Sequence, residues 1–321
     1  MWGRTVEPMN TPLYNSFSRH LRERFGCRVH RVALDAGFAC PNRDGTKGRG
    51  GCLYCDADGS RADYVEPSRS IREQMELGME RMARRFGARR FIAYFQAFTN
   101  TYAPVQKLRA LYEQALFDPD RIVGLSVGTR PDCLTAPVLD LLEEFHARTY
   151  LWVELGLESA NQATLDAHNR ADSVERFIEA ACAARRRGLR VAAHVIAGFP
   201  TDGPEDFLHA ARLINECGVS GVKLHNLFIS RRAPLARLFE KRPFALLTRE
   251  QYIGLVCDFL AVLDPQVLIH RLMGEARPGD LIGPAWCLDK AGFLGALEGE
   301  MRRRGIVQGI NFEKAENGVR R

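Results

Sequence analysis

Residues 40–55 read CPNRDGTKGRGGCLYC, and this stretch decides the fold because its three cysteines follow the spacing C-x11-C-x2-C. Four glycines separate Cys40 from Cys52, so the backbone is free to curl tightly and to turn its amide groups toward sulfur atoms or anions. The stretch directly follows an apolar, strand-like run at 29–37. In a parallel barrel the active site is built at the carboxyl ends of the strands, so we expect a site here.

Three close thiol groups predict a metal centre, and their spacing leaves its type open. A structural zinc site needs four protein ligands, so zinc requires His20, Cys27 or His30 beside the three cysteines. A 4Fe–4S cluster held by three cysteines leaves one iron open to a small molecule. Chance proximity in a glycine-rich loop is the third alternative. We favour the cluster.

A regular alternation of strand-like and helix-like segments runs through the rest of the chain. Apolar strand-like runs recur at 29–37, 89–96, 121–129, 149–159, 190–198 and 221–229, with a weaker one at 266–273. Capping boxes at Ser70–Glu73 and Thr248–Gln251, and a cap with an early proline at Asp202–Glu205, mark helix starts. Six or seven such units in series predict an α/β barrel or partial barrel, with a doubly wound open sheet as the competing architecture.

Helical segments flank the predicted barrel on both sides. One helix is predicted to open at Thr11-Pro12 and to end at Gly26, with an apolar face made of Leu13, Phe17, Leu21 and Phe25. We expect it to brace the barrel. Helices around 248–263 and 288–304 form a C-terminal extension. The chain therefore divides into an N-terminal helical brace at 1–28, a barrel core at 29–234 and the extension at 235–321.

The composition is that of a globular protein, since 46% of the 321 residues are apolar, 26% are charged and the formal net charge is +6. No stretch approaches the ~18 apolar residues of a membrane helix, and the start lacks the apolar core of a signal peptide. We therefore expect a cytoplasmic protein. Nine cysteines at irregular spacing do not suggest a disulfide framework. Cys133, Cys182, Cys217 and Cys257 are expected as small core residues, and Cys287 is a weaker candidate for a second thiol function.

Strand alternation places polar side chains on the inward face of the predicted barrel. One face of the fourth run carries Trp152, Glu154, Gly156 and Glu158, whereas the opposite face is entirely leucine and valine. Alternation along the other predicted strands likewise places residues on a shared face: Tyr94 with Gln96, Ser126 with Gly128, His194 with Ile196 and Gly198, and Lys223 with His225. Buried carboxylates are costly unless they are paired. We therefore predict a ligand site in the lumen, with structural ion pairs and hydrogen-bonded core histidines as the alternative.

The sequence resembles the radical S-adenosylmethionine (SAM) superfamily. Cys52-Leu-Tyr-Cys55, with an aromatic residue before the last cysteine, is similar to the cluster loop of that superfamily. The run DAGFACPNRDG at 35–45 resembles the YhcC/YtqA-like branch, which is related to the elongator catalytic subunit. The common loop is C-x3-C-x2-C, and the longer insert here matches only the elongator-like branch. The resemblance covers about residues 10–310 and includes the motifs at 94–102, 128–132, 154–159 and 194–200.

This resemblance implies a partial (β/α)6 barrel that binds a 4Fe–4S cluster and SAM. Cys40, Cys52 and Cys55 would hold the cluster, which cleaves SAM reductively to a 5′-deoxyadenosyl radical. By position, Gln96 would lie along the SAM amino group and Arg170 would pair with the SAM carboxylate. Glu154 or Glu158, with Ser159, would bind the ribose hydroxyls, while Ile196 and Gly198 would lie against adenine. Ser126 and His194 complete the expected cofactor-binding set, and Lys223 and His225 are left for the substrate; no residue is assigned to catalysis.

The elongator relatives modify wobble uridine in tRNA, so the resemblance implies a tRNA-modifying transferase served by an electron donor such as flavodoxin or ferredoxin. The stretch after residue 310 has no room for the elongator's acetyltransferase domain, so we expect another carbon donor or a side chain already installed. Arginine clusters at 81–90, 185–187, 231–232 and 302–304 either hold RNA or are solvated helix ends. Two alternatives are a radical SAM enzyme for a small-molecule or porphyrin-like substrate, and a non-catalytic zinc-stabilised nucleic-acid-binding protein.

Overall fold

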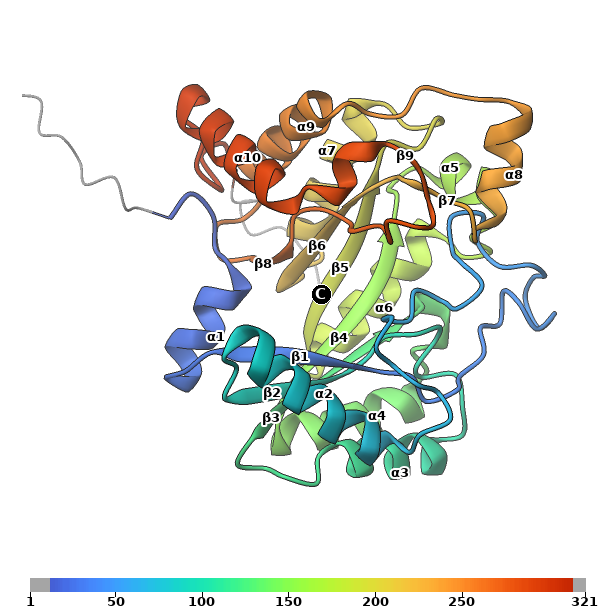
Figure 1. Cartoon of the computed structure of the whole chain (residues 1–321), viewed down its shortest axis with the longest axis vertical. Helices are drawn as coiled ribbons and strands as arrows, with labels where there is room; N and C mark the ends of the chain where they lie inside the picture. Colours follow the sequence, from blue (N-terminus) through green and yellow to red (C-terminus); the bar gives the residue numbers. More distant parts are fainter. Residues whose placement is uncertain (1–11, 314–321) are drawn as a thin grey trace, which may run out of the picture.

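Seven parallel strands form one sheet that curls into an open half-barrel in the computed structural model, which describes residues 12–313 (Figure 1). The order across the sheet is β1-β2-β3-β4-β5-β6-β8. The strands are β1 (Val29–Leu34), β2 (Arg90–Phe95), β3 (Ile122–Thr129), β4 (Tyr150–Glu158), β5 (Arg190–Ala197), β6 (Gly221–Asn226) and β8 (Leu268–Arg271). All seven predicted runs contain strands. Because the order never reverses, the partial barrel is confirmed and the doubly wound alternative is wrong.

Helices on the outer side of the sheet bury its apolar face. They are α2 (Ile71–Phe86), α3 (Val105–Ala115), α4 (Ala136–Arg148), α6 (Val174–Arg186) and α7 (Pro204–Glu216), whereas the short α5 (Gln162–Ala167) follows β4 at the carboxyl end of the sheet and adds no side chain to this apolar cluster. The outward residues of β4 belong to the main hydrophobic cluster and are at most 1% exposed: Leu151, Val153, Leu155 and Leu157. Burying each such side chain contributes about 1.5–3 kcal/mol. The outer face therefore supplies much of the stability and leaves the inner face for a site.

Two predicted capping boxes are confirmed. The Ser70 side chain accepts the Glu73 amide at the start of α2, and the Glu73 side chain accepts the Ser70 amide in return. Thr248 and Gln251 form the same reciprocal pair at the start of α9 (Arg249–Val262). These local hydrogen bonds satisfy amide groups that the first helical turn leaves free, which is why the sequence alone identified both starts.

The start of α7 differs in detail from the prediction. Its cap is Gly203 and its first residue is Pro204, so the early proline is confirmed. The neighbouring Asp202 carboxylate accepts hydrogen bonds from the Ser159 and Thr164 hydroxyls instead. Asp202 therefore ties the start of α7 to the end of β4 and to α5.

The N-terminal helix is shorter than predicted. α1 spans Phe17–Phe25 and ends at Gly26, whose φ of 69° favours glycine and ends the helix as expected. The predicted start at Thr11 lies outside the described residues. Leu13 precedes the helix, so its place on the predicted apolar face is wrong.

The segment before α1 is held by the C-terminal part of the chain. The Ile269 amide donates to the Asn15 carbonyl at 2.8 Å, and Ser16 forms a parallel bridge with Ile269. The Gln308 side chain accepts the Asn15 amide at 2.9 Å, across 293 residues of sequence. Because these backbone groups pair in strand fashion, they do not enter a helix, which explains the later start of α1.

α1 closes the amino end of the half-barrel. Phe17 stacks on His270 with ring centroids 3.9 Å apart and meets Trp152 edge-on at 5.5 Å. Both rings lie in or beside a second buried cluster, whose members are Phe17, Leu21, Val29, Ile92, Tyr150, Trp152, Ala192 and Leu268. α1 also contacts β1 and β8, the two edges of the sheet. The expected brace is therefore the floor of the lumen, and we call these aromatic and aliphatic side chains the floor cluster.

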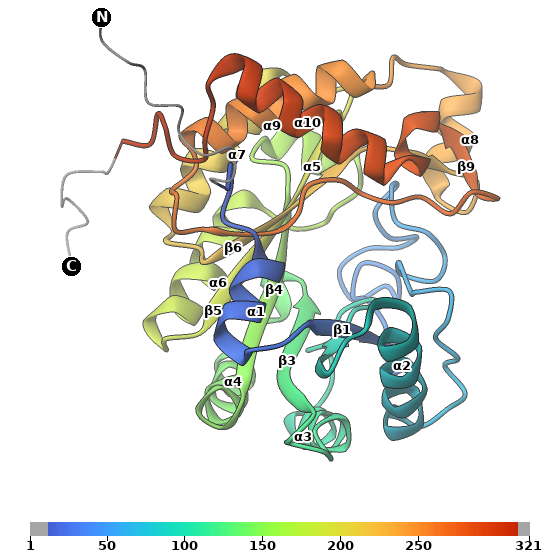
Figure 2. The same cartoon turned by 60° about the vertical axis from the view of Figure 1, so that its left-hand side comes forward.

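The C-terminal part of the chain completes the sheet and one wall of the molecule. The predicted helices are α9 and α10 (Lys290–Arg304), and Figure 2 shows α10 lying along α9. α8 (Pro234–Lys241) and a short antiparallel ladder of β7 (Ile229–Ser230) and β9 (Leu281–Gly283) were not expected. Between residues 12 and 313 the structure contains no helix with the length and apolarity needed to cross a bilayer.

Replacing Phe17 by alanine will lower the free energy of unfolding by about 3 kcal/mol, because it leaves a cavity in the floor cluster. Urea unfolding followed by circular dichroism measures the change. Leu77→Ala in α2 is the control, since Leu77 is 46% exposed, and it should stay within about 0.5 kcal/mol of wild type. Equal effects of the two substitutions would contradict the role given to α1.

Candidate active site in the barrel lumen

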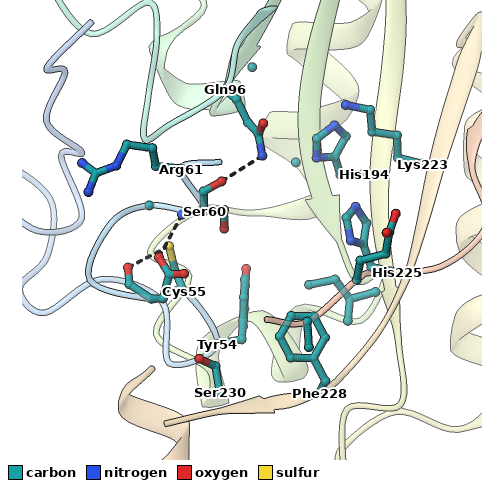
Figure 3. A pocket seen from close by; sticks show the side chains of 18 of the residues that line it. Tyr54, Cys55, Ser60, Arg61, Gln96, His194, Lys223, His225, Phe228 and Ser230 are labelled. Carbon is teal, nitrogen blue, oxygen red and sulfur yellow. Dashed lines mark hydrogen bonds between the residues drawn. The ribbon is translucent and has the colours of Figure 1, made fainter. Parts of the chain in front are cut away.

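The carboxyl end of the half-barrel contains a cavity of about 870 Å³. Its walls come from the inward side chains of β2–β6, from the loop at 40–63 and from residues 271–290. Figure 3 shows Tyr54, Cys55 and Ser60 of the loop on one side, with Lys223 and His225 of β6 on the other. A cavity of this size lies at the upper end for small-molecule sites, so it has room for a cofactor together with part of a substrate.

The three cysteines of the loop at 40–55 all line this cavity. Cys40, Cys52 and Cys55 follow the carboxyl end of β1, where the sequence predicted a site. Gly50 and Gly51 have φ of 82° and 79°, a region that side chains avoid, so the tight curl before Cys52 requires glycine. We call residues 40–55 the cysteine loop.

The cysteine loop is pinned to the segment at 169–171. The Asn42 side chain donates to the Asn169 carbonyl at 2.6 Å, and the Asn169 side chain donates to the Gly51 carbonyl at 2.8 Å. This exchange of two amide side chains fixes the loop against the connection between α5 and α6. The positions of the cysteines therefore depend on residues more than a hundred positions away.

A second anchor for the same segment is the buried ion pair of Arg130 and Asp132. The guanidinium binds both carboxylate oxygens at 2.9 Å, and it also donates to the carbonyls of Arg170 and Ala171 at 2.9 and 2.7 Å. Lys47 of the cysteine loop lies 2.8 Å from the Asp132 carboxylate. The motif at 128–132 therefore supports both the loop, through Lys47, and the segment at 169–171 to which Asn42 also binds.

Nitrogen donors point at the Cys52 sulfur. The Asn42 side-chain amide lies 3.6 Å from it, and the Arg170 guanidinium lies 3.9 Å from it. Burial, followed by the neighbouring Cys52, raises the pKa of the Cys55 thiol to about 12, so a metal must replace that proton. Three loop cysteines, one of which has two N–H donors at its sulfur, fit a negatively charged iron–sulfur cluster.

A single zinc ion has less support. In the described part of the chain no three His, Cys, Asp or Glu side chains, the loop cysteines included, are gathered around one point, so the choice between zinc and a cluster depends on the fourth ligand. His20 bonds the Tyr150 hydroxyl at 2.9 Å and His30 stacks on Phe86 at 4.4 Å, both at the amino end of the sheet. Cys27 precedes β1 at the same end. The three residues considered as a fourth zinc ligand are therefore remote from the cysteine loop.

Glu154 is the centre of a polar network in the lumen and is 1% exposed. Its carboxylate accepts the Ser126 hydroxyl at 2.7 Å and lies 3.0 Å from His194 Nε2. It also pairs with Lys223 and lies 3.5 Å from the Arg31 guanidinium. Burial favours the neutral acid, but these two cations hold the pKa of Glu154 well below its usual range. Its oxygens are therefore occupied by structural partners, as the ion-pair alternative predicted.

Lys223 has a second partner besides Glu154. Its ammonium group donates to the Tyr94 hydroxyl at 2.9 Å. Burial, together with the Arg31 and Arg271 guanidiniums, lowers the pKa of Lys223 in spite of the neighbouring carboxylate. The lysine therefore lies in a cavity wall that contains other cations.

Two histidines extend the network toward the cavity. The rings of His194 and His225 lie 5.8 Å apart, and both side chains line the cavity (Figure 3). Burial is the main cause that lowers the pKa of each, so both are neutral near pH 7. Within residues 12–313, Nε2 of His225 is buried without a hydrogen-bond partner.

Glu158 is a second carboxylate of β4 that lines the cavity. It lies 4.0 Å from Arg170, which donates to the Gly156 carbonyl at 3.0 Å. A side chain at Gly156 would collide with both Glu158 and Arg170, so glycine is required at this point of β4. Glu158 itself has φ of 66°, and the other described non-glycine residues with positive φ also border the cavity or flank Arg170: Ser60, Phe98, Asn169 and Ala171. Such strained backbone gathers at functional sites.

Of the other predicted site residues, some line the cavity and some lie behind its wall. Gln96 and Ile196 line the cavity, and the Gln96 side chain donates to the Ser60 carbonyl at 2.8 Å (Figure 3). The cavity wall does not include Ser126, Ser159 or Gly198. The first two donate their hydroxyls to carboxylates behind the wall, and a Cβ at Gly198 would lie 2.9 Å from Leu247. Gly198 thus meets a packing requirement.

Two arginines of the lumen were missed in the sequence. Arg31 was overlooked although the parity of β1 places it inward, two residues after Val29 of the floor cluster. Arg271 is the last residue of β8. The pairing of β6 with β8 shifts register beside Lys223, so alternation along the strands does not show which face of the sheet Arg271 lies on. Alternation along β1 could therefore have predicted that Arg31 faces the lumen, whereas no sequence pattern indicates this for Arg271.

Cys287 lines the cavity and is 1% exposed. The Asn226 side chain lies 2.8 Å from its sulfur, and burial raises the pKa of the thiol to about 12. The four cysteines that the sequence predicts as small core residues lie away from the cavity and are buried or half-buried: Cys133, Cys182, Cys217 and Cys257.

Among the described residues, five of the thirteen arginines in the predicted clusters form ion pairs, and none of the five belongs to the cluster at 81–90. Asp58, just after the cysteine loop, contacts Arg61 at 3.4 Å, Arg277 at 3.8 Å and also Arg232, which joins the loop to the C-terminal wall. On the outer helices, the pairs are Arg187 with Asp140, Arg302 with Glu298, Arg303 with Glu300 and Arg304 with Asp258. Solvated helix ends are therefore the better interpretation of 302–304. By contrast, Arg85 lines the cavity.

Comparison with known families gives two adjoining matches. The radical SAM superfamily model matches residues 40–214, and the radical SAM C-terminal domain matches residues 219–303. The chain is 40% identical to the uncharacterized protein YtqA of Bacillus subtilis over 94% of each chain. It is 39% identical to protein YhcC of Escherichia coli over 92% of this chain and 94% of that protein. The resemblance noted in the sequence is confirmed.

More distant relatives share part of the chain. A tRNA uridine(34) acetyltransferase of Dehalococcoides mccartyi is 28% identical over 48% of this chain and 34% of its own length. The solved structure of archaeal Methanocaldococcus infernus Elp3 superposes with a TM-score of 0.68 at 16% identity, covering 87% of this chain and 64% of that one. The latter similarity concerns the fold.

Serine at Cys40, Cys52 or Cys55 will remove most of the iron and sulfide that wild type retains after anaerobic reconstitution, because each variant loses one cluster ligand. Elemental analysis and the visible absorption spectrum measure the loss. Cys182→Ser is the control, because Cys182 lies on α6 away from the cavity. Full iron content in the loop variants, or zinc in wild type, would contradict the assignment.

Asp132→Asn will lower the free energy of unfolding at pH 7 by about 2 kcal/mol. Burial alone raises the pKa of this carboxyl, but Arg130 and Lys47 lower it to about 2 in the folded chain. Because the folded pKa lies below the unfolded one, the contribution is complete above about pH 5 and is lost as the pH falls toward 2. Urea unfolding should show the same difference from wild type at pH 7 and pH 5 and a smaller one at pH 3, and an equal difference at all three values would refute this origin.

Proposed function

The chain belongs to the radical SAM superfamily, whose members use a 4Fe–4S cluster and SAM, and we propose that it is a radical SAM enzyme that modifies tRNA. One observation carries the proposal: three cysteines open onto a cavity whose inner wall is polar and ionised. The proposed setting is the cytoplasm, with a flavodoxin or ferredoxin as electron donor.

A bound cluster would supply the electron for reductive cleavage of SAM, and so the radical chemistry that removes a hydrogen atom from the substrate. The residues of this chain hold and orient the reactants. Cys40, Cys52 and Cys55 ligate the cluster, and Arg170 offsets its negative charge at Cys52. Glu158 offers carboxylate oxygens to ribose hydroxyls in the cavity wall.

Water must be kept from such a reactive site. The floor cluster closes the amino end of the lumen with tightly packed aromatic rings. Ile196 adds an apolar surface that suits a purine ring. Together these features favour a cofactor bound at the carboxyl end and a substrate group that enters beside it.

The choice of tRNA as substrate is supported by two features. The chain is related over about half its length to a protein named for acetylation of uridine 34 of tRNA. Arg85 lines the cavity outside the lumen network and has no ion pair within residues 12–313, whereas Arg61, Arg277 and Lys290 of the same wall are paired with carboxylates. The unpaired charge of Arg85 suits a phosphate of a nucleic acid.

Reduced, cluster-loaded protein will form 5′-deoxyadenosine from SAM when tRNA from cells lacking this protein is added, because that tRNA is unmodified at its target. Mass spectrometry of nucleosides from the same cells should show a changed wobble uridine. Restoring the wild-type gene should reverse the change, whereas the Cys40→Ser form should not. Unchanged tRNA nucleosides together with an altered small molecule would favour the small-molecule alternative and refute the tRNA proposal.

A further inference from the structure

Two cations are neighbours across adjacent strands in the cavity wall. Lys223 of β6 and Arg271 of β8 are partners in the parallel register, and both side chains line the cavity. Like charges on directly paired strand residues repel, and the repulsion is stronger where water is scarce. A natural sheet keeps such a pair only if something offsets the repulsion.

The carboxylates of the lumen do not offset it fully. Glu154 contacts both Lys223 and Arg31, so one negative charge serves two cations. Glu158 lies nearer to Arg170. In the part of the chain that the structure describes, Arg271 is half-buried and makes no ion pair. The inner lumen therefore has an excess of positive charge.

Neighbouring groups show the effect of that excess. After burial, Arg271 is the largest cause that lowers the pKa of His225, and it contributes to the lowered pKa of Lys223. Nε2 of His225 is also buried without a partner among the described residues. An anion bound beside Lys223 and Arg271 would relieve the repulsion, and a turn of the His225 ring toward it would give the buried nitrogen a partner.

We propose that Arg271, Lys223 and His225 form a subsite for an oxyanion of the substrate, either a carboxylate or a phosphate monoester. Oxygen atoms of such a group accept hydrogen bonds from a guanidinium, an ammonium group and an imidazole N–H. The subsite rests on the proposed function only in placing a substrate in this lumen. The subsite adds to the proposed function the chemical class of the substrate group that lies deepest in the lumen.

The position of the subsite selects an end of the substrate rather than its middle. Below it the lumen is blocked by Trp152, His270 and Phe17, which pack against one another. A phosphodiester inside an RNA chain would have to enter and leave again, and the floor cluster leaves no exit on that side. For a tRNA substrate, the oxyanion is therefore an acidic side chain already attached to the base.

Calorimetry on the cluster- and SAM-loaded protein without reductant tests the subsite with four probes: 5-carboxymethyluridine, its methyl ester, uridine 5′-monophosphate and uridine. We expect one of the two anionic probes to bind roughly tenfold more tightly than the ester and uridine. Tighter binding of 5-carboxymethyluridine would identify a carboxylate as the ligand, and tighter binding of uridine 5′-monophosphate would identify a phosphate monoester. Arg271→Met should abolish the preference, and Arg271→Lys should restore part of it.

The nuclear magnetic resonance lines of 13C-acetate and inorganic phosphate measure the subsite without a nucleoside. Arg22→Met is the matched control, because Arg22 is an exposed arginine of α1 away from the cavity. If line broadening requires Arg271 but no nucleoside binds, the subsite is correct and the uridine proposal is wrong. If Arg271→Met changes neither the broadening nor the probe preference, the subsite is wrong.

Discussion

Glu154 uses its two oxygens to join four strands, through Arg31 of β1, Ser126 of β3, His194 of β5 and Lys223 of β6. Removing one partner of a buried ion pair costs about 3–5 kcal/mol, because the remaining charge is left without compensation. The contacts of Glu154 therefore constrain one another, and the curvature of the half-barrel must keep all four strands within reach. The position of Lys223, and with it the inner cavity wall, follows from this constraint.

β4 alone displays the layers of the lumen in order. Trp152 lies in the floor cluster, Glu154 in the ionised layer, and Glu158 beside Arg170 near the cysteine loop. Between the last two, Gly156 leaves space that the Arg170 guanidinium occupies. The inward side chains of β4 thus change from apolar packing at Trp152 to a carboxylate at the cavity at Glu158. They lie in one row because alternate residues of a strand share one face.

Local patterns predicted the elements, and long-range contacts decided the details. Period-two alternation identified the inward face of β4, and reciprocal side-chain bonds identified the starts of α2 and α9. The three cysteines were recognisable because spacing along one loop carries the signal. By contrast, the start of α1 depends on Asn15 meeting Ile269, and the roles of Ser159 and Gly198 depend on Asp202 and Leu247. No local pattern reports such partners, since they are brought together only by the completed fold.

The hydrogen bond between Asn15 and Gln308 spans nearly the whole chain, and it holds the segment that leads into α1. Contacts of such high sequence separation form late, because a long loop must close before they give any stability. During synthesis the first helix therefore waits for the last part of the chain before it docks. Until then the half-barrel lacks its floor, so a nascent or truncated chain has a lumen open to water at both ends. The lumen is thus able to shelter a reactive cofactor only when the segment around Asn15 meets the segment around Gln308.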